Sequence, residues 1–387
     1  MNPRFDRNRI AVRPLAERKN KLDIRRDRID PESFQPELSA PAAESVCRAA
    51  AEIRAARAKG APVILAFGAH AIKNGLSRVM IRFMEGGWVT HFATNGAGVI
   101  HDWEFAYQGC SGEDVKRYVA EGQFGIWEET GACLNLAIAV GAYRGLGYGE
   151  AVGTLVAEDG VLIPGFEELA AAIRAGAERT GSLQAGKAGV GAAEEAVLAR
   201  AAAAADLAAL TGRFGVPPGF LRVEHPYKAY GLQAAAYAAR VPFTAHPMFG
   251  HDIIYTHPMN RGAAIGRAAD PDFLSFTDSV SRLEGGVYLS VGSAVMSPMI
   301  FEKALSLSRN QARGQGGAIE DFSIYVVDLA KSAWDWTHDG EPPPDNPAYY
   351  LRFCKTFSRM GGRMTYTSAD NRSFLVALLR TLEAPCG

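Results

Sequence analysis

Side chains that could move protons are concentrated in one short segment of the chain. His101, Asp102 and Glu104 lie close together, directly after the run of small residues Thr94–Gly98. A histidine beside carboxylates can act as a general acid or base, and the same residues can also cap a helix. Both roles stay open on these residues alone.

A second polar segment contains His246, His251 and Asp252. A carboxylate in a cleft shielded from water suits a cationic amine, because opposite charges attract more strongly there. We therefore assign Asp252 and His251 to substrate binding, although Asp252 could also cap the next turn. With His225 and His257 these histidines could form a metal site, but their spacings match neither an i, i+4 pair nor HExxH, so we predict no metal.

Two glycine-containing turns could let the backbone approach a phosphate. They are Thr94-Asn95-Gly96-Ala97-Gly98 and Gly292-Ser293, and neither has the GxGxxG spacing. A third turn, Gly145-Leu146-Gly147-Tyr148-Gly149, is typical of the end of a helix.

Lys355 is embedded in the apolar stretch LRFCKTF. Burial favours the neutral amine, which an imine-forming nucleophile requires. The same sequence also fits a lysine whose stem lies on apolar surface while its charge reaches water.

These segments must be positioned by regular elements, and the apolar pattern predicts an α/β fold. Short apolar runs predict six strands: 62–67, 89–93, 241–244, 286–291, 322–328 and 363–367. Helical spacing is found over 42–58, 76–84, 230–240, 271–283, 298–311 and 372–382. Strands that alternate with helices predict a doubly wound, mostly parallel, Rossmann-like sheet with helices on both faces. Ligands bind beyond the carboxyl ends of such strands, where most of the polar segments fall.

The chain divides into a basic arm and one domain. Residues 1–30 contain ten Lys/Arg and five Asp/Glu, so we expect residues 1–40 to form an arm. Residues 41–387 form a single α/β domain, with an Ala-rich helical insertion at about 166–214.

Composition excludes several classes of protein. The 387 residues have a formal net charge of -1, without the basic surplus of a nucleic-acid binder. No apolar run approaches the ~20 residues of a membrane span, and no signal sequence begins the chain, so we expect a cytoplasmic protein. The five cysteines include no CxxC pair, which argues against a zinc ribbon and a disulfide framework.

The order of these segments resembles deoxyhypusine synthase over about residues 61–382. The family's SGLREIIRYL is similar to NGLSRVMIRF (74–83), and its TTAGGVEED is similar to TNGAGVIHD (94–102). Its IPVFVPALTDGSLGDM resembles VPFTAHPMFGHDI (241–253). Its glycine turn resembles Gly292-Ser293-Ala294, its YADAT resembles residues 367–371, and its AVSWGKI resembles YLRFCKT.

The resemblance implies an NAD-dependent transferase that moves an aminobutyl-type group from a polyamine through an imine, with Lys355 as the covalent carrier. It implies a homo-oligomer, typically a tetramer. It also implies that the cofactor contacts Asn95, Gly96, Ala97, Gly292, Ser293 and Asp370.

The chain departs from that family around the reacting groups. The paired acidic residues after TTAGG become Ile100 and His101, and the family's active-site histidine becomes Pro298. The indole beside the lysine becomes Phe353. A protein lysine is therefore not the expected acceptor.

A second, shorter resemblance points to different chemistry. The segment NGAGVIHDWE is similar to the N-A-x-x-x-H-D-x-E stretch of the archaeal-type ornithine cyclodeaminase family, also called LOR/SDH. That family uses NAD on a basic amino acid, and its histidine and aspartate correspond to His101 and Asp102.

The leading hypothesis is an NAD-dependent enzyme that acts on a small cationic amine. His101 shuttles protons, Asp252, Asp102, Glu104 and His251 bind the substrate, and Lys355 carries the transferred group. The alternatives are an ornithine cyclodeaminase-like lyase that does not need Lys355, and a metabolite-binding relic of the fold without turnover.

Overall fold

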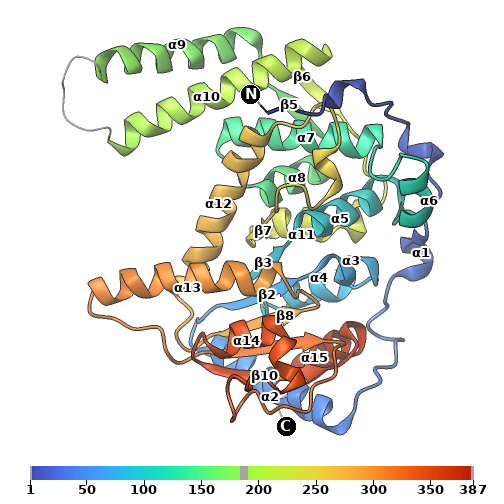
Figure 1. Ribbon diagram of the computed structural model, residues 1–387, viewed down its shortest axis with the longest axis vertical. Coiled ribbons are helices and arrows are strands. Elements are labelled where there is room, and N and C mark those ends of the chain that lie inside the picture. The colour runs from blue at the N-terminus through green and yellow to red at the C-terminus, as the bar shows by residue number, and fades with distance from the viewer. Residues whose placement is uncertain (1, 184–190, 385–387) are drawn as a thin grey trace.

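The computed structural model describes residues 2–183 and 191–384. Its centre is a six-stranded, wholly parallel sheet in the order β10-β9-β8-β2-β3-β7 (Figure 1). The strands are β2 (Val63–Phe67), β3 (His91–Thr94), β7 (Phe243–Ala245), β8 (Val287–Val291), β9 (Ser323–Asp328) and β10 (Arg363–Ser368). All six predicted strands and the doubly wound α/β class are confirmed.

The central strand β2 is buried on both faces, as its unbroken apolar sequence predicts. Because successive side chains point to opposite faces of a strand, Val63, Leu65 and Phe67 join one hydrophobic core, and Ile64 and Ala66 join the other. The sheet therefore separates two cores.

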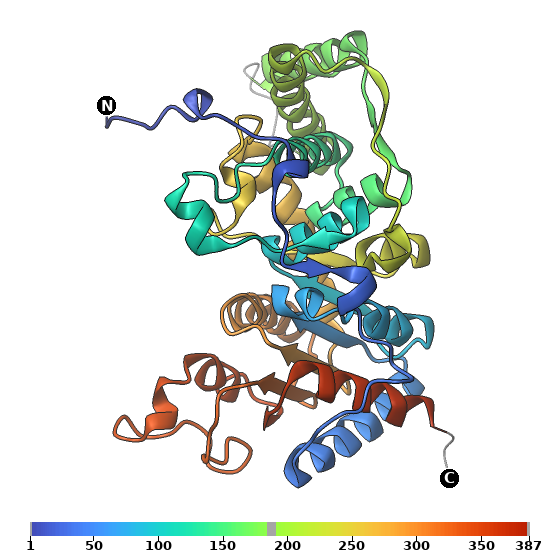
Figure 2. The same cartoon turned by 90° about the vertical axis from the view of Figure 1, so that its right-hand side faces the viewer.

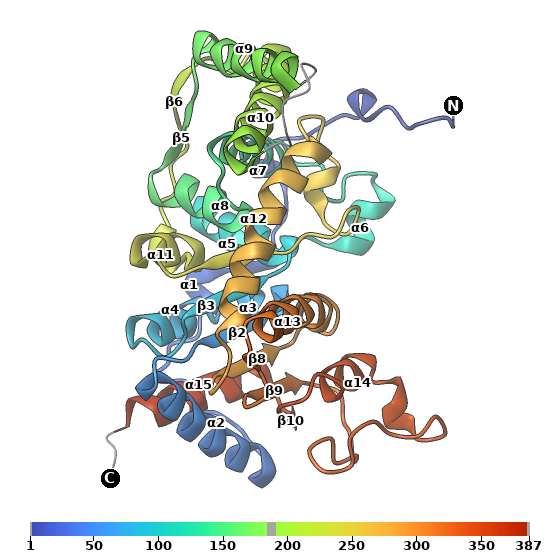
Figure 3. The same ribbon diagram turned by 90° about the vertical axis from the view of Figure 1, so that its left-hand side faces the viewer.

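Helices cover both faces of the sheet (Figure 3). One core contains residues of α2 (Ala40–Ala58), α4 (Ser77–Glu85), α11 (Leu232–Ala239) and α15 (Asn371–Glu383). The other contains residues of α12 (Gly262–Ser281), α13 (Met296–Gly314) and α14 (Arg352–Ser358). The predicted start of α12 at Pro271 is wrong, because the helix begins at Gly262 and continues through this proline.

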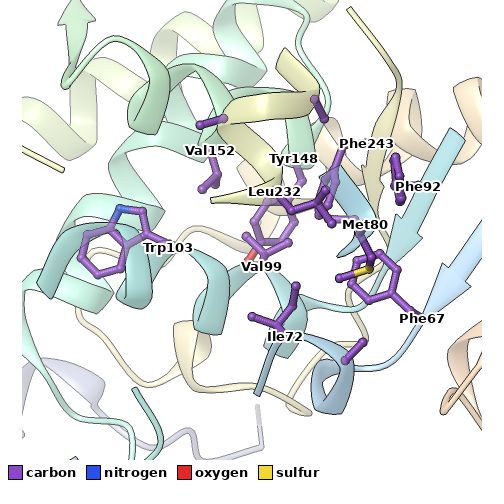
Figure 4. Close-up of a cluster of buried hydrophobic side chains, with 14 of the residues drawn as sticks. Phe67, Ile72, Met80, Phe92, Val99, Trp103, Tyr148, Val152, Leu232 and Phe243 are labelled. Carbon is purple, nitrogen blue, oxygen red and sulfur yellow. The ribbon is translucent and has the colours of Figure 1, made fainter. Parts of the chain in front are cut away.

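A helical layer extends the first core past the edge strand β7. It is made of α5 (Gly96–Gln108), α7 (Glu128–Arg144) and α8 (Tyr148–Ala157). Apolar side chains such as Val99, Val152 and Leu232 fill this layer (Figure 4).

The Ala-rich insertion forms two helices, α9 (Phe166–Leu183) and α10 (Ala192–Phe214). The pair projects at one end of the molecule (Figure 1). An antiparallel ribbon that the sequence did not predict, β5 (Gly160–Ile163) with β6 (Gly219–Arg222), joins the pair to the body.

The N-terminal segment lies along the body of the protein (Figure 2). It contains η1 (Arg7–Arg9), η2 (Leu15–Glu17), β1 (Leu22–Asp23) and α1 (Ile24–Asp27). Leu15 and Ile24 are each 1% exposed, and β1 pairs with β4 (Cys110–Ser111). This segment is anchored in the core, although its composition suggested a solvated arm.

Short elements complete the fold. They are α3 (Ala69–Lys73), α6 (Val115–Ala120), η3 (Lys228–Tyr230), η4 (Ile253–Tyr255) and η5 (Pro347–Tyr350). Within the described ranges, no helix combines the length and apolar character needed to cross a bilayer.

Candidate active site

The sheet has a switch in strand order between β2 and β8. From these hydrogen-bonded neighbours the chain builds outward through β3 and β7 on one side, and through β9 and β10 on the other. Ligands of open parallel sheets bind beyond the carboxyl ends of the two strands at such a switch. The residues that follow β2 and β8 therefore lie where a ligand is expected.

Two glycines bring the backbones that follow β2 and β8 into contact. A Cβ atom on Gly68 would lie 2.1 Å from the carbonyl oxygen of Gly292, and Gly292 has a φ of +57°. Neither position readily accepts a side chain, because the first lacks space and the second has a left-handed backbone. The backbone is thus bare at the switch point, where it can approach a phosphate closely.

The predicted cofactor residues gather at this edge. Asn95, Gly96 and Ala97 follow β3, Gly292 and Ser293 follow β8, and Asp370 follows β10. Two of them also cap helices: Asn95 Oδ1 accepts a hydrogen bond from the Gly98 N–H at 2.9 Å, and Asp370 Oδ1 accepts one from the Arg372 N–H at 2.9 Å. These caps fix the starts of α5 and α15 beside the switch.

Asp328, the last residue of β9, is a carboxylate that the sequence analysis did not select. Because β9 lies between β8 and β10, Asp328 lies at the carboxyl edge of the sheet, between the turn at Gly292 and Asp370. Its Oδ1 accepts a hydrogen bond from the Ala330 N–H at 2.9 Å. Two carboxylates thus end adjacent strands on one side of the switch.

Asp252 lies against the start of α5, on the other side of the switch. A Cβ atom on Gly96 would lie 2.0 Å from its Oδ2, so this glycine makes room for the carboxylate. Its Oδ1 accepts a hydrogen bond from the Ile254 N–H at 3.0 Å. Burial raises the pKa of Asp252 to about 6. The structure therefore brings a predicted substrate residue next to a predicted cofactor residue.

Two tyrosine hydroxyls near Asp252 have no hydrogen-bond partner among the described residues. They belong to Tyr148 and Tyr255, and both oxygens are buried. The Tyr148 ring lies in the apolar cluster near Val99 and Leu232 (Figure 4). Burial, together with the charge of Asp252, raises the pKa of both phenols. Buried polar groups are normally hydrogen-bonded, so these two mark a place that a polar ligand could complete.

His101 is held by a hydrogen-bonded chain that fixes its tautomer. Its Nδ1 lies 2.7 Å from the Ser111 Oγ, and that hydroxyl donates to Glu104 Oε2 at 2.5 Å. A serine hydroxyl has one proton, so the Nδ1–H of His101 donates to Ser111 and Nε2 keeps its lone pair. Burial lowers the pKa of His101 to about 4, so the imidazole is neutral at pH 7. The ring is thus prepared to accept a proton at Nε2.

Glu104, which the sequence placed among the substrate-binding residues, lies inside the protein and supports this chain. It is 1% exposed, and Arg18 of the N-terminal segment donates to both of its oxygens at 2.7 Å. Thr130 donates to Oε1 at 3.1 Å. Burial alone would raise the pKa of Glu104, but the charge and hydrogen bonds of Arg18 hold it below its usual range.

Asp102, the second carboxylate that the sequence placed near the substrate, holds the start of another helix. It is 1% exposed and accepts hydrogen bonds from the N–H groups of Leu232 and Gln233 at 2.9 and 3.0 Å. It therefore caps the start of α11. The helical position of Asp102, one residue after His101, turns it away from the face that His101 uses.

His246 follows β7 and ends a buried chain of hydrogen bonds. Its Nε2 lies 2.9 Å from the Thr244 Oγ1, which lies 2.9 Å from the Nε2 of His91. The Nδ1 of His91 lies 2.8 Å from the Ser279 Oγ. Burial lowers the pKa of both histidines to about 3, so both rings are neutral. These contacts hold β3, β7 and α12 together.

The remaining histidines of the polar segments lie in different surroundings. His251 is exposed beside Asp252, whereas His225 is buried against the rings of Trp103 and Tyr107. No group of three or more His, Cys, Asp or Glu residues that could hold a metal occurs in the part of the chain that the structure describes.

Lys355 makes the contacts of a charged ammonium. Its Nζ lies 3.3 Å from Glu341 Oε1 and 3.5 Å from the centre of the Tyr349 ring. A carboxylate and an aromatic face both stabilise the positive charge, whereas an imine-forming nucleophile must lose it. The apolar sequence around Lys355 suggested a desolvated amine and gave no sign of these partners.

No protein-family model and no curated protein sequence matches the chain. Among solved structures, the chain is similar to unliganded AgrE, with 13% identity and a TM-score of 0.41 over 90% of this chain and 34% of that one. The complex of AgrE with ornithine and NAD+ gives 12% identity, a TM-score of 0.41 and the same coverage. A LOR/SDH protein from Methanococcus maripaludis S2 has 11% identity and a TM-score of 0.41, over 92% of this chain and 74% of that one.

The chain spans about a third of the length of the AgrE chains. The assignment of residues rests on the geometry described above.

Several residues of the site were absent from the sequence prediction. They are Arg18, Ser111, Tyr148, Tyr255 and Asp328. Arg18 and Ser111 lie in segments without a motif, and Tyr148 and Tyr255 resemble ordinary core residues. Asp328 alone had a usable signal, because an acidic residue that ends an apolar strand lies at the edge where ligands bind.

Proposed function

We propose that the chain is an NAD-dependent enzyme that oxidises the carbon–nitrogen bond of a small basic amine or amino acid. The observation that carries the proposal is the switch point, where Gly68 and Gly292 bare the backbone between β2 and β8. Asp252 and His101 supply a cation-binding group and a base on one side of it.

The residues at the switch fit a dinucleotide. The backbone at Gly68 and Gly292 carries no side chain, so it would leave room for the pyrophosphate at the switch point. Asp328 and Asp370 end neighbouring strands, where carboxylates can accept hydrogen bonds from ribose hydroxyls. When bound, the nicotinamide supplies a hydride acceptor.

Asp252, Tyr148 and Tyr255 would bind the amine. An ammonium has three donors, and this cluster offers one carboxylate and two phenol oxygens that have no hydrogen-bond partner among the described residues. Burial raises the pKa of Asp252 to about 6, and a bound cation would lower this raised pKa and keep the carboxylate ionised. The apolar surroundings of Tyr148 exclude water from this contact.

His101 would accept the proton that leaves the substrate nitrogen. Its Nε2 holds the lone pair, while Ser111 and Glu104 hold the ring in one tautomer. Arg18 keeps Glu104 ionised, so Glu104 has no proton to donate. The Ser111 hydroxyl must therefore donate to Glu104 and accept from His101. The pKa of about 4 makes His101 a weak base in the free protein, and positive charge formed on it would be stabilised by Glu104.

This scheme resembles the cyclodeaminase-type alternative more than transfer through a lysine. The ion pair of Lys355 with Glu341 favours that choice, because the amine is engaged as a cation. Assembly into an oligomer stays a prediction.

Turnover of L-ornithine, putrescine and spermidine with NAD+ tests the proposal, with NADH absorbance as the readout. Asp252→Asn should abolish turnover and leave NAD+ affinity unchanged, and Lys355→Arg should keep oxidation. A transferred product that disappears in Lys355→Arg while oxidation is kept, with the fold intact, would favour the transfer mechanism instead.

A further inference from the structure

A cavity of about 660 Å³ opens beside the edge strand β7, between α8, α11 and α12. Its lining includes four side chains that can bind polar ligands: Glu150, Gln233, Arg240 and Asp272. The cavity contains none of the residues assigned above to the nucleotide or to the amine, so it is separate from the candidate active site.

Gln233 provides a buried acceptor without a donor. The residue is 1% exposed, and its Oε1 has no hydrogen-bond partner among the described residues. Its Nε2 donates to the Val99 carbonyl at 3.1 Å and to Asp102 at 3.0 Å, which fixes the orientation of the amide. An orphaned buried acceptor in the wall of a cavity calls for a ligand that donates a hydrogen bond.

Two acidic side chains line the same cavity. Asp272 is 3% exposed and accepts hydrogen bonds from the N–H groups of Gly149 and Ala245 at 2.9 and 2.7 Å. Burial, with a contribution from the charge of Glu150, raises the pKa of Asp272 to about 7. Glu150 itself makes no side-chain hydrogen bond or ion pair within the described residues. Two carboxyl groups that repel one another favour a cation between them.

These acidic groups also argue against an anion at the glycine turn before α8. A Cβ atom on Gly147 would lie 1.8 Å from Asp272 Oδ1, so the carboxyl group already occupies the start of the helix. A phosphate would have to displace it. This contact explains the glycine at position 147.

Arg240 supplies a positive charge to the cavity. It makes no hydrogen bond or ion pair through its side chain in the described part of the chain. Its backbone has a φ of +54°, which is uncommon for a residue with a side chain. A glycine would adopt this left-handed C-cap of α11 without that cost to the backbone.

We infer that this cavity binds a small zwitterion of the amino-acid class. The ammonium lies among Gln233 Oε1, Glu150 and Asp272, and the carboxylate lies against the guanidinium of Arg240. The acceptor side chains thus suit the ammonium end of the ligand, and the guanidinium suits its carboxylate end. The inference does not depend on the proposed function, because it uses no residue of the candidate active site.

Calorimetric titration of the full chain with L-alanine and L-glutamine tests this inference. Propionate and propylamine serve as ligands that carry only one of the two charged ends. At least one amino acid should bind, and both half-ligands should bind at least about tenfold more weakly. Glu150→Gln and Arg240→Gly should each reduce affinity for the amino acid by at least about tenfold.

Loss of affinity in these variants should not come from unfolding. Glycine suits the left-handed backbone at position 240, so Arg240→Gly should melt no lower than the parent. Arg222→Ala, which removes an exposed arginine paired with Glu224, should leave affinity unchanged. The inference is overturned if neither amino acid binds, if propylamine binds as well as the amino acids, or if Arg240→Gly binds with parental affinity.

Discussion

Arg18 of the N-terminal segment and Glu104 of α5 form an ion pair with two N–O distances of 2.7 Å, and each side chain is only 1% exposed. The pair joins residues far apart in the chain. It also supports Ser111 and, through it, His101. The N-terminal segment is therefore part of the candidate active site.

Removal of one partner should be costly for stability. Arg18→Met leaves the Glu104 carboxylate buried without its cation, and loss of one partner of a buried ion pair costs about 3–5 kcal/mol. Urea unfolding should show that loss. The double variant Arg18→Met/Glu104→Leu should recover a large part of the lost free energy of unfolding, because no unpaired charge remains. A double variant as unstable as the single one would show that lost packing, and not the unpaired charge, causes the destabilisation.

Ser111→Ala should slow turnover without changing nucleotide binding. The variant removes the acceptor for the Nδ1–H of His101, so the ring loses its fixed tautomer. General acid–base catalysis contributes roughly 10²–10⁴-fold, and we expect kcat to fall within that range while the Kd for NAD+ stays constant. Thr130→Val is the matched control, because it removes a hydrogen bond to Glu104 without touching His101. Equal losses of kcat in both variants would refute the tautomer argument.

Acid should destabilise the protein through His91 and His246. Both are neutral in the fold, with pKa values lowered to about 3 by burial, whereas unfolding restores a pKa near 6.5. Their stabilising contribution is thus complete above about pH 6.5 and is lost as pH falls toward 3. At about pH 4.5 each histidine should cost roughly 2–3 kcal/mol of the free energy of unfolding.

Urea unfolding between pH 7 and pH 4.5 measures this loss. His91→Gln should flatten the pH dependence, because glutamine does not titrate. His338→Asn, at an exposed histidine, should follow the parent. A parental profile in His91→Gln would show that other groups govern acid stability.

Gly147→Ala should destabilise the start of α8. Its Cβ would lie 1.8 Å from Asp272 Oδ1, and the carboxyl group holds both α8 and β7. Overpacking of this kind costs about 1–3 kcal/mol, measured as a lower urea midpoint. Gly212→Ala in α10 meets no atom within 4 Å, so this control should be neutral or slightly stabilising. No difference between the two variants would mean that Asp272 moves aside freely.

The strands of the sheet could be predicted from the sequence because they are buried on both faces. Runs such as Val63–Phe67 have no polar residue to interrupt them, and the helices between them have regular spacing. The β5–β6 ribbon was missed because Gly219–Arg222 is largely exposed and has no apolar alternation. The buried role of Leu15 was missed because its neighbours in the sequence are charged.

The positions of the site residues were easier to predict than their roles. Asn95 and Asp252 were found because small and polar residues follow apolar strands. Asp102 and Glu104 were assigned to substrate because local sequence does not show which face of a helix meets another segment. Their partners, Leu232 and Arg18, are distant in the chain, so only the folded structure reveals them.

Calorimetric titration of the full chain with NAD+ and with NADH, after removal of any nucleotide that copurifies, tests the central claim most directly. The account predicts binding of at least one form with a Kd in the range of about 1–100 μM, and at least about tenfold weaker binding when Asp328 and Asp370 are both changed to asparagine. Absence of binding by both forms to the folded parent would contradict the account and remove the redox mechanism.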